Sequence, residues 1–267
     1  MKKVLSVSVA AYNLERLLSR CLDSFLPEPV LNRVEVIVTD DGSSDNTAQT
    51  ARDYCLRYPE TFRLITQKNS GPGSTVNSGI RNASGEYFRM VDGDDWVDAE
   101  GMGKLLDFLE THSVDMVCTP YITVDEHSGE RKCIPAASEK FGEVIKAGEL
   151  LSQGRDLSMH NVVFRTSVLR ENGIILDNGF YTDMEYLLFP MFFVSTASAL
   201  ECPVYMYRVG DVSQSMSIKS LQKREDEHLL VLDHLVRAYE KRKNEVPALS
   251  VEPDPGRDHF IAWRIAQ

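Results

Sequence analysis

The sequence predicts an α/β protein with a Rossmann-like, mostly parallel sheet flanked by helices and a less regular C-terminal region. Three observations support this fold class. Strand-like apolar segments alternate with amphipathic helical segments through the first half of the chain. Hydrophobic residues make up 43% of the 267 residues, which is enough for a sizeable core. The second half is less regular, and its stretch 124–145 is polar and rich in turn residues.

The first half contains five segments with strand character, and a helical segment follows each of the first four. Because β-α-β units place their strands parallel, the carboxyl ends of these strands should meet at one edge of the sheet, where such folds bind ligands. The predicted strands are 4–10, 34–39, 62–66, 87–91 and 116–123, and the predicted helices are 14–25, 48–58, 74–83 and 102–109.

Beyond residue 123 the pattern predicts fewer elements. The polar stretch 124–145 fits a loop or an edge hairpin. The tail 247–267 shows no clear element, which suggests a truncated chain or a tail that packs against something absent. The other expected elements are a helix near 147–153, a strand at 162–164, a helical turn at 166–171, a strand at 201–207 and an amphipathic helix whose apolar face carries Leu229, Leu232, Val236 and Tyr239.

Charge and cysteine content exclude several function classes. The net charge of −11 and the pI near 5.1 argue against a nucleic-acid-binding surface. The five cysteines are odd in number, scattered and free of C-x-x-C spacing, so they predict a reducing compartment. No apolar run approaches the ~18 residues of a membrane span, so we expect a soluble protein. The N-terminal apolar stretch is short and interrupted by serines, which favours a first strand over a signal peptide.

The most informative motif is the acidic sequence Asp-Gly-Asp-Asp at 92–95, which is followed by Trp96. Its three carboxylates come directly after the apolar segment 87–91. Carboxylates delivered to the end of a strand suit Mg²⁺ or Mn²⁺ rather than zinc, and such ions bridge one or two carboxylates to substrate phosphates. A solvated acidic turn before the next helix is the alternative interpretation.

A second acidic strand end, Asp40-Asp41, follows the segment 34–39. A carboxylate there can accept a hydrogen bond from an imide N–H such as that of uracil. Ser44 or Asp45 can N-cap the next helix at the same time. The segment 71–73, Gly-Pro-Gly, is a weak phosphate-loop signal and equally fits a turn. The first strand has no glycine fingerprint after it, which argues against a dinucleotide-binding Rossmann domain.

Four motifs in a fixed order resemble the family 2 glycosyltransferases, which have the GT-A fold. The likeness is dense over about residues 4–120. Further on, 180–185 resembles the family's Glu-Asp motif, although Thr182 stands in place of the first acid. A smaller departure is Ala10-Ala11, where proline and a small residue are usual. The four motifs are 7–13, 36–45, 69–87 and 92–96, and a thinner likeness continues at 204–208 and 213–217.

The resemblance implies an inverting glycosyltransferase that uses a nucleoside diphosphate sugar, most naturally a UDP-sugar. The acceptor would be a hydroxyl of a glycan or a lipid-linked molecule in bacterial surface polysaccharide assembly, and Mn²⁺ or Mg²⁺ would assist. The expected location is cytoplasmic, with possible peripheral membrane contact through a missing C-terminal part. We divide the chain into a nucleotide-sugar-binding half at 1–123, an acceptor-binding half of the same domain at 124–218 and a helical extension at 219–267.

The resemblance also implies roles for individual residues. Asp94 would hold the metal, with Asp92 directed toward the ribose or the ion. Asp183 would be the general base; Glu185 is its rival, and N-capping a helix at 184–191 is its alternative role. The nucleotide-sugar-binding residues would be Ala11, Tyr12, Asn13, Asp41, Lys68, Gly71, Arg81, Asp92 and Gly93, with Tyr12 stacking on the base, Asp41 reading the uracil edge, and Lys68 and Arg81 contacting the diphosphate or ordering loops. Trp96 and Arg208 are assigned to the acceptor or a nearby loop.

Other functions stay open at this point. A catalytically silent nucleotide- or glycan-binding protein of the same fold is compatible with the altered Thr182. A haloacid-dehalogenase-type phosphatase would need Asp-x-Asp-x-Thr after the first strand, and a nucleotide-sugar pyrophosphorylase would need a glycine-rich, basic loop there; neither is present. A processive synthase is disfavoured because the chain has no Gln-x-x-Arg-Trp sequence. The role of the pair His160-Asn161 is not assigned.

Overall fold

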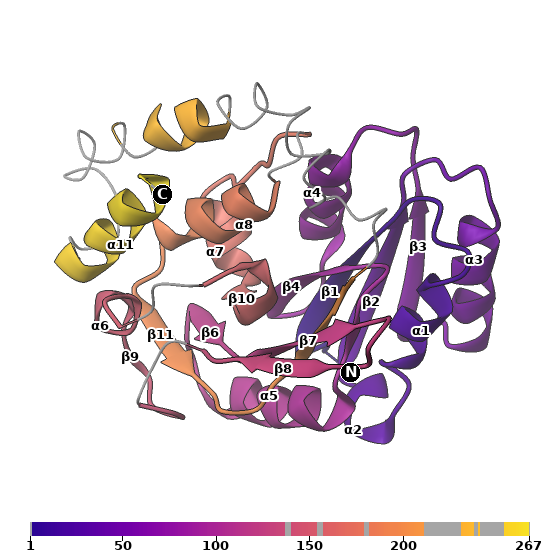
Figure 1. The fold of residues 1–267 in the computed structure, drawn as a ribbon, viewed down its shortest axis with the longest axis horizontal. Helices are drawn as coiled ribbons and strands as arrows, with labels where there is room; N and C mark the ends of the chain where they lie inside the picture. Colours follow the sequence, from indigo (N-terminus) through magenta and orange to yellow (C-terminus); the bar gives the residue numbers. More distant parts are fainter. Residues whose placement is uncertain are drawn as a thin grey trace.

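The computed structural model describes residues 2–136, 140–153, 157–178, 182–210, 231–237, 240 and 254–266. An eight-stranded sheet in the order β3-β2-β1-β4-β10-β6-β11-β9 is flanked by helices, and a four-stranded sheet has the order β5-β12-β7-β8 (Figure 1). The strands are β1 (Leu5–Ala11), β2 (Val34–Asp40), β3 (Phe62–Thr66), β4 (Tyr87–Asp92), β5 (Trp96–Val97), β6 (Met116–Cys118), β7 (Tyr121–Asp125), β8 (Arg131–Ile134), β9 (Ile145–Lys146), β10 (Val162–Arg165), β11 (Thr196–Ala199) and β12 (Tyr205–Val209). The helices are α1 (Leu18–Asp23), α2 (Glu28–Leu31), α3 (Thr47–Arg57), α4 (Pro72–Asn82), α5 (Ala99–Thr111), α6 (Ala147–Leu151), α7 (Thr166–Glu171), α8 (Thr182–Met191) and α11 (Pro255–Ile265), with a 3₁₀ turn η1 (Met159–Asn161).

The first four long strands are parallel neighbours, as the alternating pattern predicts. β1 lies between β2 and β4, and its residues are almost all buried because both faces of the sheet are covered. In this register Ala11 pairs with Asp40 and Ala10 pairs with Asp92. The carboxyl ends of β1, β2 and β4 therefore lie side by side at one edge, and this edge carries the acidic motifs.

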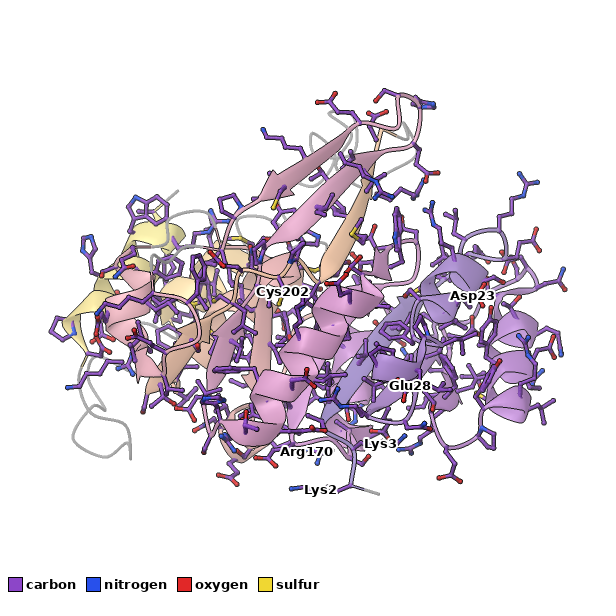
Figure 2. All side chains as sticks on the ribbon, turned by 90° about the horizontal axis from the view of Figure 1, so that it is seen from below. Lys2, Lys3, Asp23, Glu28, Arg170 and Cys202 are labelled. Atoms are coloured by element: carbon purple, nitrogen blue, oxygen red, sulfur yellow. The ribbon has the colours of Figure 1, made fainter. Side chains whose placement is uncertain are left out.

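The predicted strand at 116–123 is wrong as a single element. β6 ends at Cys118 and belongs to the large sheet, whereas β7 begins at Tyr121 and belongs to the small one. Pro120 lies between them, and proline cannot donate a hydrogen bond to a strand ladder. Of the two alternatives for 124–145, a loop or an edge hairpin, the hairpin is present: β8 lies in this stretch and pairs with β7, which begins earlier, at Tyr121. Figure 2 shows these strands projecting from the body of the protein together with β12.

The later part of the chain differs from prediction in four places. The tail was expected to lack an element, yet α11 forms there, and the Asp254 carboxylate caps it by accepting the N–H groups of Gly256 and Arg257. Residues 231–237 are helical, but their buried side chains are Val231 and Leu235, not the expected face. Within that expected face Val236 is exposed, Leu232 is half-buried, and Leu229 and Tyr239 lie outside the described residues. The late strand runs over 205–209 instead of 201–207, and β11 was not predicted.

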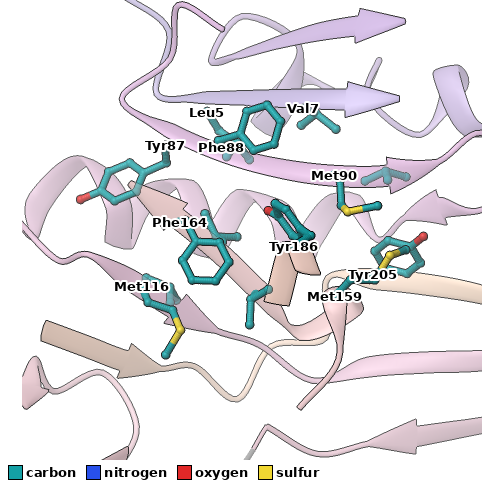
Figure 3. Close-up of a cluster of buried hydrophobic side chains, with 14 of the residues drawn as sticks. Leu5, Val7, Tyr87, Phe88, Met90, Met116, Met159, Phe164, Tyr186 and Tyr205 are labelled. Atoms are coloured by element: carbon teal, nitrogen blue, oxygen red, sulfur yellow. The ribbon is translucent and has the colours of Figure 1, made fainter. Parts of the chain in front are cut away.

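The core joins the parallel strands to the helix that carries Asp183. Phe88 of β4, Phe164 of β10 and Tyr186 of α8 are fully buried together (Figure 3). The rings of Phe164 and Tyr186 meet edge to face with centroids 5.5 Å apart. Each such aromatic side chain contributes about 1.5–3 kcal/mol by burial, so α8 is held firmly against the sheet.

Candidate active site

The loop after β1 leaves one aromatic ring open to solvent. The Asn13 backbone adopts a left-handed conformation with φ of +53°, its N–H donates to Ser43 Oγ at 2.9 Å, and its Oδ1 accepts the Ser44 N–H at 2.9 Å. These bonds tie the end of β1 to the loop after β2. Ala11 is buried at the end of the strand, while Tyr12 is 51% exposed beside it. A rigid loop thus presents the Tyr12 ring at the edge where the strands end.

Asp41 orders the loop that leads into α4. It is buried, and its Oδ1 accepts hydrogen bonds from Gln67 Nε2 at 2.7 Å and Ser70 N–H at 3.0 Å. Its Oδ2 accepts the Gly71 N–H at 2.9 Å. Three of its bonds are therefore internal, and the expected hydrogen bond to uracil would have to use a remaining lone pair.

Two glycines at the start of α4 allow another segment to cross it closely. A Cβ on Gly71 or Gly73 would overlap the backbone oxygens of Asn178 and Asp177. The glycines in the weak phosphate-loop signal are therefore needed for chain packing. Asn77 on the same helix holds this segment: its Nδ2 donates to the Leu176 carbonyl at 2.7 Å, and its Oδ1 accepts the Leu176 N–H at 2.9 Å. The sequence does not mark Asn77 as a functional residue. The one indication is that a polar amide stands among the buried residues of α4.

Asp95 anchors the acidic turn from inside the protein. Its Oδ2 accepts a hydrogen bond from Tyr205 Oη at 2.6 Å, and its Oδ1 accepts the Arg208 N–H at 2.7 Å. The Tyr205 hydroxyl in turn accepts the Asp92 N–H at 3.2 Å. Gly93 fits under the turn because a Cβ would lie 2.7 Å from the Ala10 carbonyl oxygen. Asp95 is thus buried and structural, whereas Asp92 and Asp94 stay partly accessible.

Two arginines contact Asp94, one at its carboxyl group and one at its backbone carbonyl. Arg208, expected at the acceptor or on a loop, lies on β12, is 5% exposed and pairs with Asp94 Oδ2 at 2.8 Å. Arg20 donates to the Asp94 carbonyl at 3.4 Å and stacks on Trp96, 4.0 Å from the ring centroid. Glu126 pairs with Arg20 at 2.6 Å, which fixes the guanidinium in place. Sequence reasoning missed Arg20, which lies on a different element from the motif.

The Asp92, Asp94 and Asp183 side chains converge at this edge. Burial raises the pKa of Asp92 to about 7, and repulsion from the neighbouring Asp94 and Asp183 carboxylates adds to that rise in pKa. Within the described residues the Asp92 side chain has no hydrogen-bond donor beside it. A site with carboxylate oxygens, in which Arg208 compensates the charge of Asp94 and no cation pairs with Asp92 within the described residues, fits Mg²⁺ or Mn²⁺, since two carboxylates suffice when phosphates and water complete the coordination.

The two candidates for the general base occupy different environments. Asp183 lies in the first turn of α8 with an exposed side chain, although enough protein surrounds its carboxyl group to raise its pKa by desolvation. Glu185 is completely buried, and its Oε2 accepts the Asp177 N–H at 2.6 Å. Burial raises the pKa of Glu185 to about 7. Asp183 lies close enough to Asp92 to affect its pKa, whereas Glu185 faces Asp177.

The structure does not bring all the expected cations to the site. Lys68 is exposed on the loop before α4, near the edge. Arg81 lies at the other end of α4, about 14 Å along the helix axis from Pro72. The prediction that Arg81 contacts the diphosphate is therefore wrong. Arg170 holds that end by donating to the Arg81 carbonyl at 2.8 Å. Arg89 is fully buried, and it donates to the His160 carbonyl.

An aromatic cluster lies next to the acidic edge. The His160 ring stacks on Tyr207 with centroids 4.3 Å apart and meets Tyr121 at 5.0 Å and Tyr205 at 4.7 Å. Burial lowers the pKa of His160 to about 3, so its ring is neutral. Burial and the nearby Asp95, Asp92 and Asp94 carboxylates raise the pKa of Tyr207 to about 12. The unassigned His160 therefore belongs to a partly exposed aromatic wall that the sequence did not reveal.

Two further observations bear on the cellular setting. All five cysteines are free thiols, and two of them, Cys21 and Cys118, are buried. In the described part of the chain no helix combines the length and apolarity that crossing a bilayer requires.

Comparison with known sequences gives one family. A family described as "Glycosyl transferase family 2" matches residues 6–173. The chain is similar to the Bacillus subtilis protein named as uncharacterized glycosyltransferase EpsJ, with 36% identity over 117 residues, 44% of this chain and 33% of that protein. It is also similar to chondroitin synthase from Escherichia coli, with 32% identity over 123 residues, 46% of this chain and 18% of that protein. The matches thus span a third or less of these two relatives.

Comparison with solved structures shows the same fold. The S. aureus TarS fragment 1–349 in complex with UDP-GlcNAc superposes with a TM-score of 0.70 at 22% identity, covering 98% of this chain and 71% of that one. The mannosyltransferase PcManGT from Pyrobaculum calidifontis, in complex with GDP-Man and Mn²⁺, superposes with a TM-score of 0.61 at 15% identity. The match covers 100% of this chain and 73% of that one. The α/β architecture with a large sheet flanked by helices is the GT-A architecture that the sequence predicts.

Proposed function

The chain belongs to glycosyl transferase family 2, and from this premise we propose that it moves a sugar from a UDP-sugar to a hydroxyl of a glycan or lipid-linked acceptor. The convergence of Asp92, Asp94 and Asp183 at one sheet edge carries the proposal. The likeness to a TarS structure that contains UDP-GlcNAc supports a nucleotide-sugar donor of the uridine type. The partial coverage of the relatives leaves the sugar and the acceptor to experiment.

The donor would bind along the ends of β1, β2 and β4. The exposed Tyr12 ring is available to stack on the base, and Asp41 holds the adjoining loop in shape. Asp94 and Asp92 would hold Mn²⁺ or Mg²⁺, as the donor set favours and as the Mn²⁺ in the PcManGT complex supports. Such an ion supplies Lewis-acid stabilisation of the diphosphate leaving group. Arg208 keeps the Asp94 carboxyl group oriented from the opposite side.

Asp183 would remove the proton from the acceptor hydroxyl as the hydroxyl attacks the sugar. Desolvation raises the pKa of this carboxyl group, which makes its conjugate base a better proton acceptor. A carboxylate base within hydrogen-bond reach contributes about 10²–10⁴-fold to rate. Direct attack by the acceptor, without an enzyme nucleophile, inverts the anomeric centre.

The acceptor would lie against the aromatic wall of Tyr121, His160 and Tyr207. Aromatic faces offer apolar surface to sugar rings, and these side chains stand next to the acidic edge. We place the protein on the cytoplasmic side of a membrane, with peripheral contact to lipid-linked acceptors. The five free cysteines support a reducing compartment.

The test is calorimetric titration of UDP, GDP and dTDP, each with Mn²⁺ and with EDTA, followed by assays of UDP-sugar hydrolysis and transfer. We expect metal-dependent binding that favours UDP. Preference for another nucleotide would keep the reaction class and remove the uridine assignment. Metal-dependent binding with neither hydrolysis nor transfer would favour the catalytically silent alternative, and absence of nucleotide binding would contradict both.

A further inference from the structure

A second cluster of metal-ligand side chains lies on the far side of α8 from the acidic edge. Asp177, Glu185 and His234 place their ligand atoms within 4.8 Å of one another. His234 Nδ1 pairs with Asp177 Oδ2 and lies 4.0 Å from Glu185 Oε1. The three residues come from the segment before α8, from α8 itself and from the helix 231–237. His234 is distant in sequence from the other two residues and becomes their neighbour through tertiary packing.

Glu185 has an unused ligand atom inside this cluster. The residue is 0% exposed, and its Oε2 accepts the Asp177 N–H at 2.6 Å, which fixes the carboxyl plane. Its other oxygen, Oε1, is buried and receives no hydrogen bond within the described residues. A buried carboxylate oxygen without a donor is unfavourable, because desolvation is not offset. The oxygen faces His234, so an ion there would satisfy it.

We propose that Asp177, Glu185 and His234 bind a divalent transition-metal ion of the Zn²⁺ class. One imidazole nitrogen and two carboxylate oxygens form a donor set that zinc accepts, with water in the fourth position. Mg²⁺ and Ca²⁺ prefer oxygen ligands only, and Mn²⁺ binds nitrogen-containing sites more weakly than zinc. Tetrahedral zinc separates its ligand atoms by about 3.3–3.5 Å. His234 Nδ1 lies 4.0 Å from Glu185 Oε1, whereas it contacts Asp177 Oδ2 directly, so the ion would enter by separating this pair.

The surroundings hold two of the three ligands in place before an ion arrives. The Asn77 side chain makes two hydrogen bonds to the backbone of Leu176, the residue before Asp177. Glu185 sits in a packed helix next to the fully buried Tyr186. The third ligand comes from the helix 231–237, which rests on the core through Val231 and Leu235. Bound metal would therefore fasten this helix to α8, and the site does not depend on the proposed sugar transfer.

The test is Zn²⁺ binding to the full chain, measured by calorimetry and by metal analysis after dialysis. The proteins are the wild type, His234→Gln, Asp177→Asn and the control His127→Gln, whose side chain lies on the exposed β7–β8 turn. Asp94→Asn is included to remove any ion from the acidic edge. We expect one Zn²⁺ in the wild type, His127→Gln and Asp94→Asn. In His234→Gln and Asp177→Asn the affinity should fall by more than about 100-fold, since even the loss of a side chain that only hydrogen-bonds a metal ligand costs about 10–100-fold.

Thermal unfolding with and without Zn²⁺ gives a second readout. Zn²⁺ should raise the melting temperature of the wild type and of His127→Gln but not that of His234→Gln. Equal Zn²⁺ binding by the wild type and His234→Gln would overturn the proposal. It would also be overturned if Asp94→Asn were the one variant that lost Zn²⁺ binding. A wild type that binds no Zn²⁺ would overturn it too, and would leave His234 and Asp177 as a direct ion pair.

Discussion

The acidic edge, where β1, β2 and β4 end, and the aromatic wall of Tyr121, His160 and Tyr207 differ in how far along the chain their contacts reach. At the edge, the loop after β1 bonds to the loop after β2 through Asn13 and Ser43, 30 residues apart. In the aromatic wall, His160 meets Tyr121 across 39 residues and Tyr207 across 47, and Tyr205 ties the wall to Asp95 of the acidic turn across 110 residues. The edge is built from consecutive β-α-β units, whereas the wall is assembled from elements that meet only in the folded chain. Substitutions should therefore affect donor binding and transfer separately.

The largest effect is expected from Asp94→Asn, which tests the edge. Asparagine keeps the size of the side chain but removes the charge that would hold the ion. Metal-assisted UDP affinity should fall by about 100-fold or more, and transfer should be lost. Calorimetry with Mn²⁺ and with EDTA measures this directly. Unchanged Mn²⁺-assisted affinity would move the metal away from Asp94.

Asp183→Asn tests the proposed transfer step apart from donor binding. The amide cannot take a proton, so transfer should fall by about 10²–10⁴-fold. UDP affinity in Mn²⁺ should stay near the wild-type value, because the donor is expected at the strand ends. Steady-state transfer assays and calorimetry on the same preparation separate the two effects. Retained transfer would assign the base to another group.

Asn77→Ala probes a contact that joins α4, next to the acidic edge, to the segment before α8. The change leaves the buried Leu176 N–H and carbonyl without partners, which should lower the free energy of unfolding by about 2–3 kcal/mol. Asn82→Ala on the same helix is the matched control, since its side chain bonds only to Ser78 within α4. Its effect should stay within about 0.5 kcal/mol. Urea unfolding measures the free energy of unfolding of both variants. Equal losses of stability would mean that the Asn77 hydrogen bonds do not hold α4 to the segment before α8.

Asp92→Asn should reveal the cost of keeping the acids together without metal. The pKa of Asp92 is about 7 in the folded chain against 3.8 for the unperturbed group, so the folded state holds an extra proton between these values. This contribution to stability is complete below pH 4 and declines as pH rises through 7. The shift corresponds to at most about 4 kcal/mol, and coupling to Asp94 and solvent screening reduce it to about 1–2 kcal/mol.

In EDTA at pH 8, Asp92→Asn should therefore be more stable than the wild type by about 1–2 kcal/mol. At pH 4 the two should be nearly equal, because the wild-type carboxyl group is protonated there. Urea unfolding at both pH values measures the difference, and saturating Mn²⁺ should reverse its sign at pH 8. If the difference in unfolding free energy between the variant and the wild type were the same at pH 4 and pH 8, the acids would not repel each other.

The smallest effect is expected from Arg81→Ala. Its position at the far end of α4 is about 14 Å along the helix axis from the loop at the edge, beyond the Debye length of about 8–10 Å. UDP affinity should be unchanged within error by calorimetry. A clear loss of affinity would return Arg81 to the donor site and weaken the division between the two regions.

The sequence predicts the edge better than the wall, for physical reasons. Short-range periodicity and turn chemistry are enough to place β1, β2 and β4 and to bring Asp41 and Asp92 to one edge. The break at Pro120 was readable from proline chemistry but was missed. The pairing of Arg208 with Asp94 and the stacking of His160 on Tyr207 depend on tertiary contacts that no local pattern encodes. The capped helix α11 had a signal in Asp254, an acidic residue directly before Pro255, but the prolines around it obscured the element.

The ion pair between Arg208 and Asp94 has a consequence for the order in which ligands load. An ion that arrives alone must compete with this guanidinium for the same carboxyl group, and most of its coordination would be water. An ion that arrives with a diphosphate brings phosphate oxygens, and the added negative charge offers the arginine a new partner. Under the proposed function, loading of the ion and of the donor would therefore be positively cooperative, each raising the affinity for the other by the same factor.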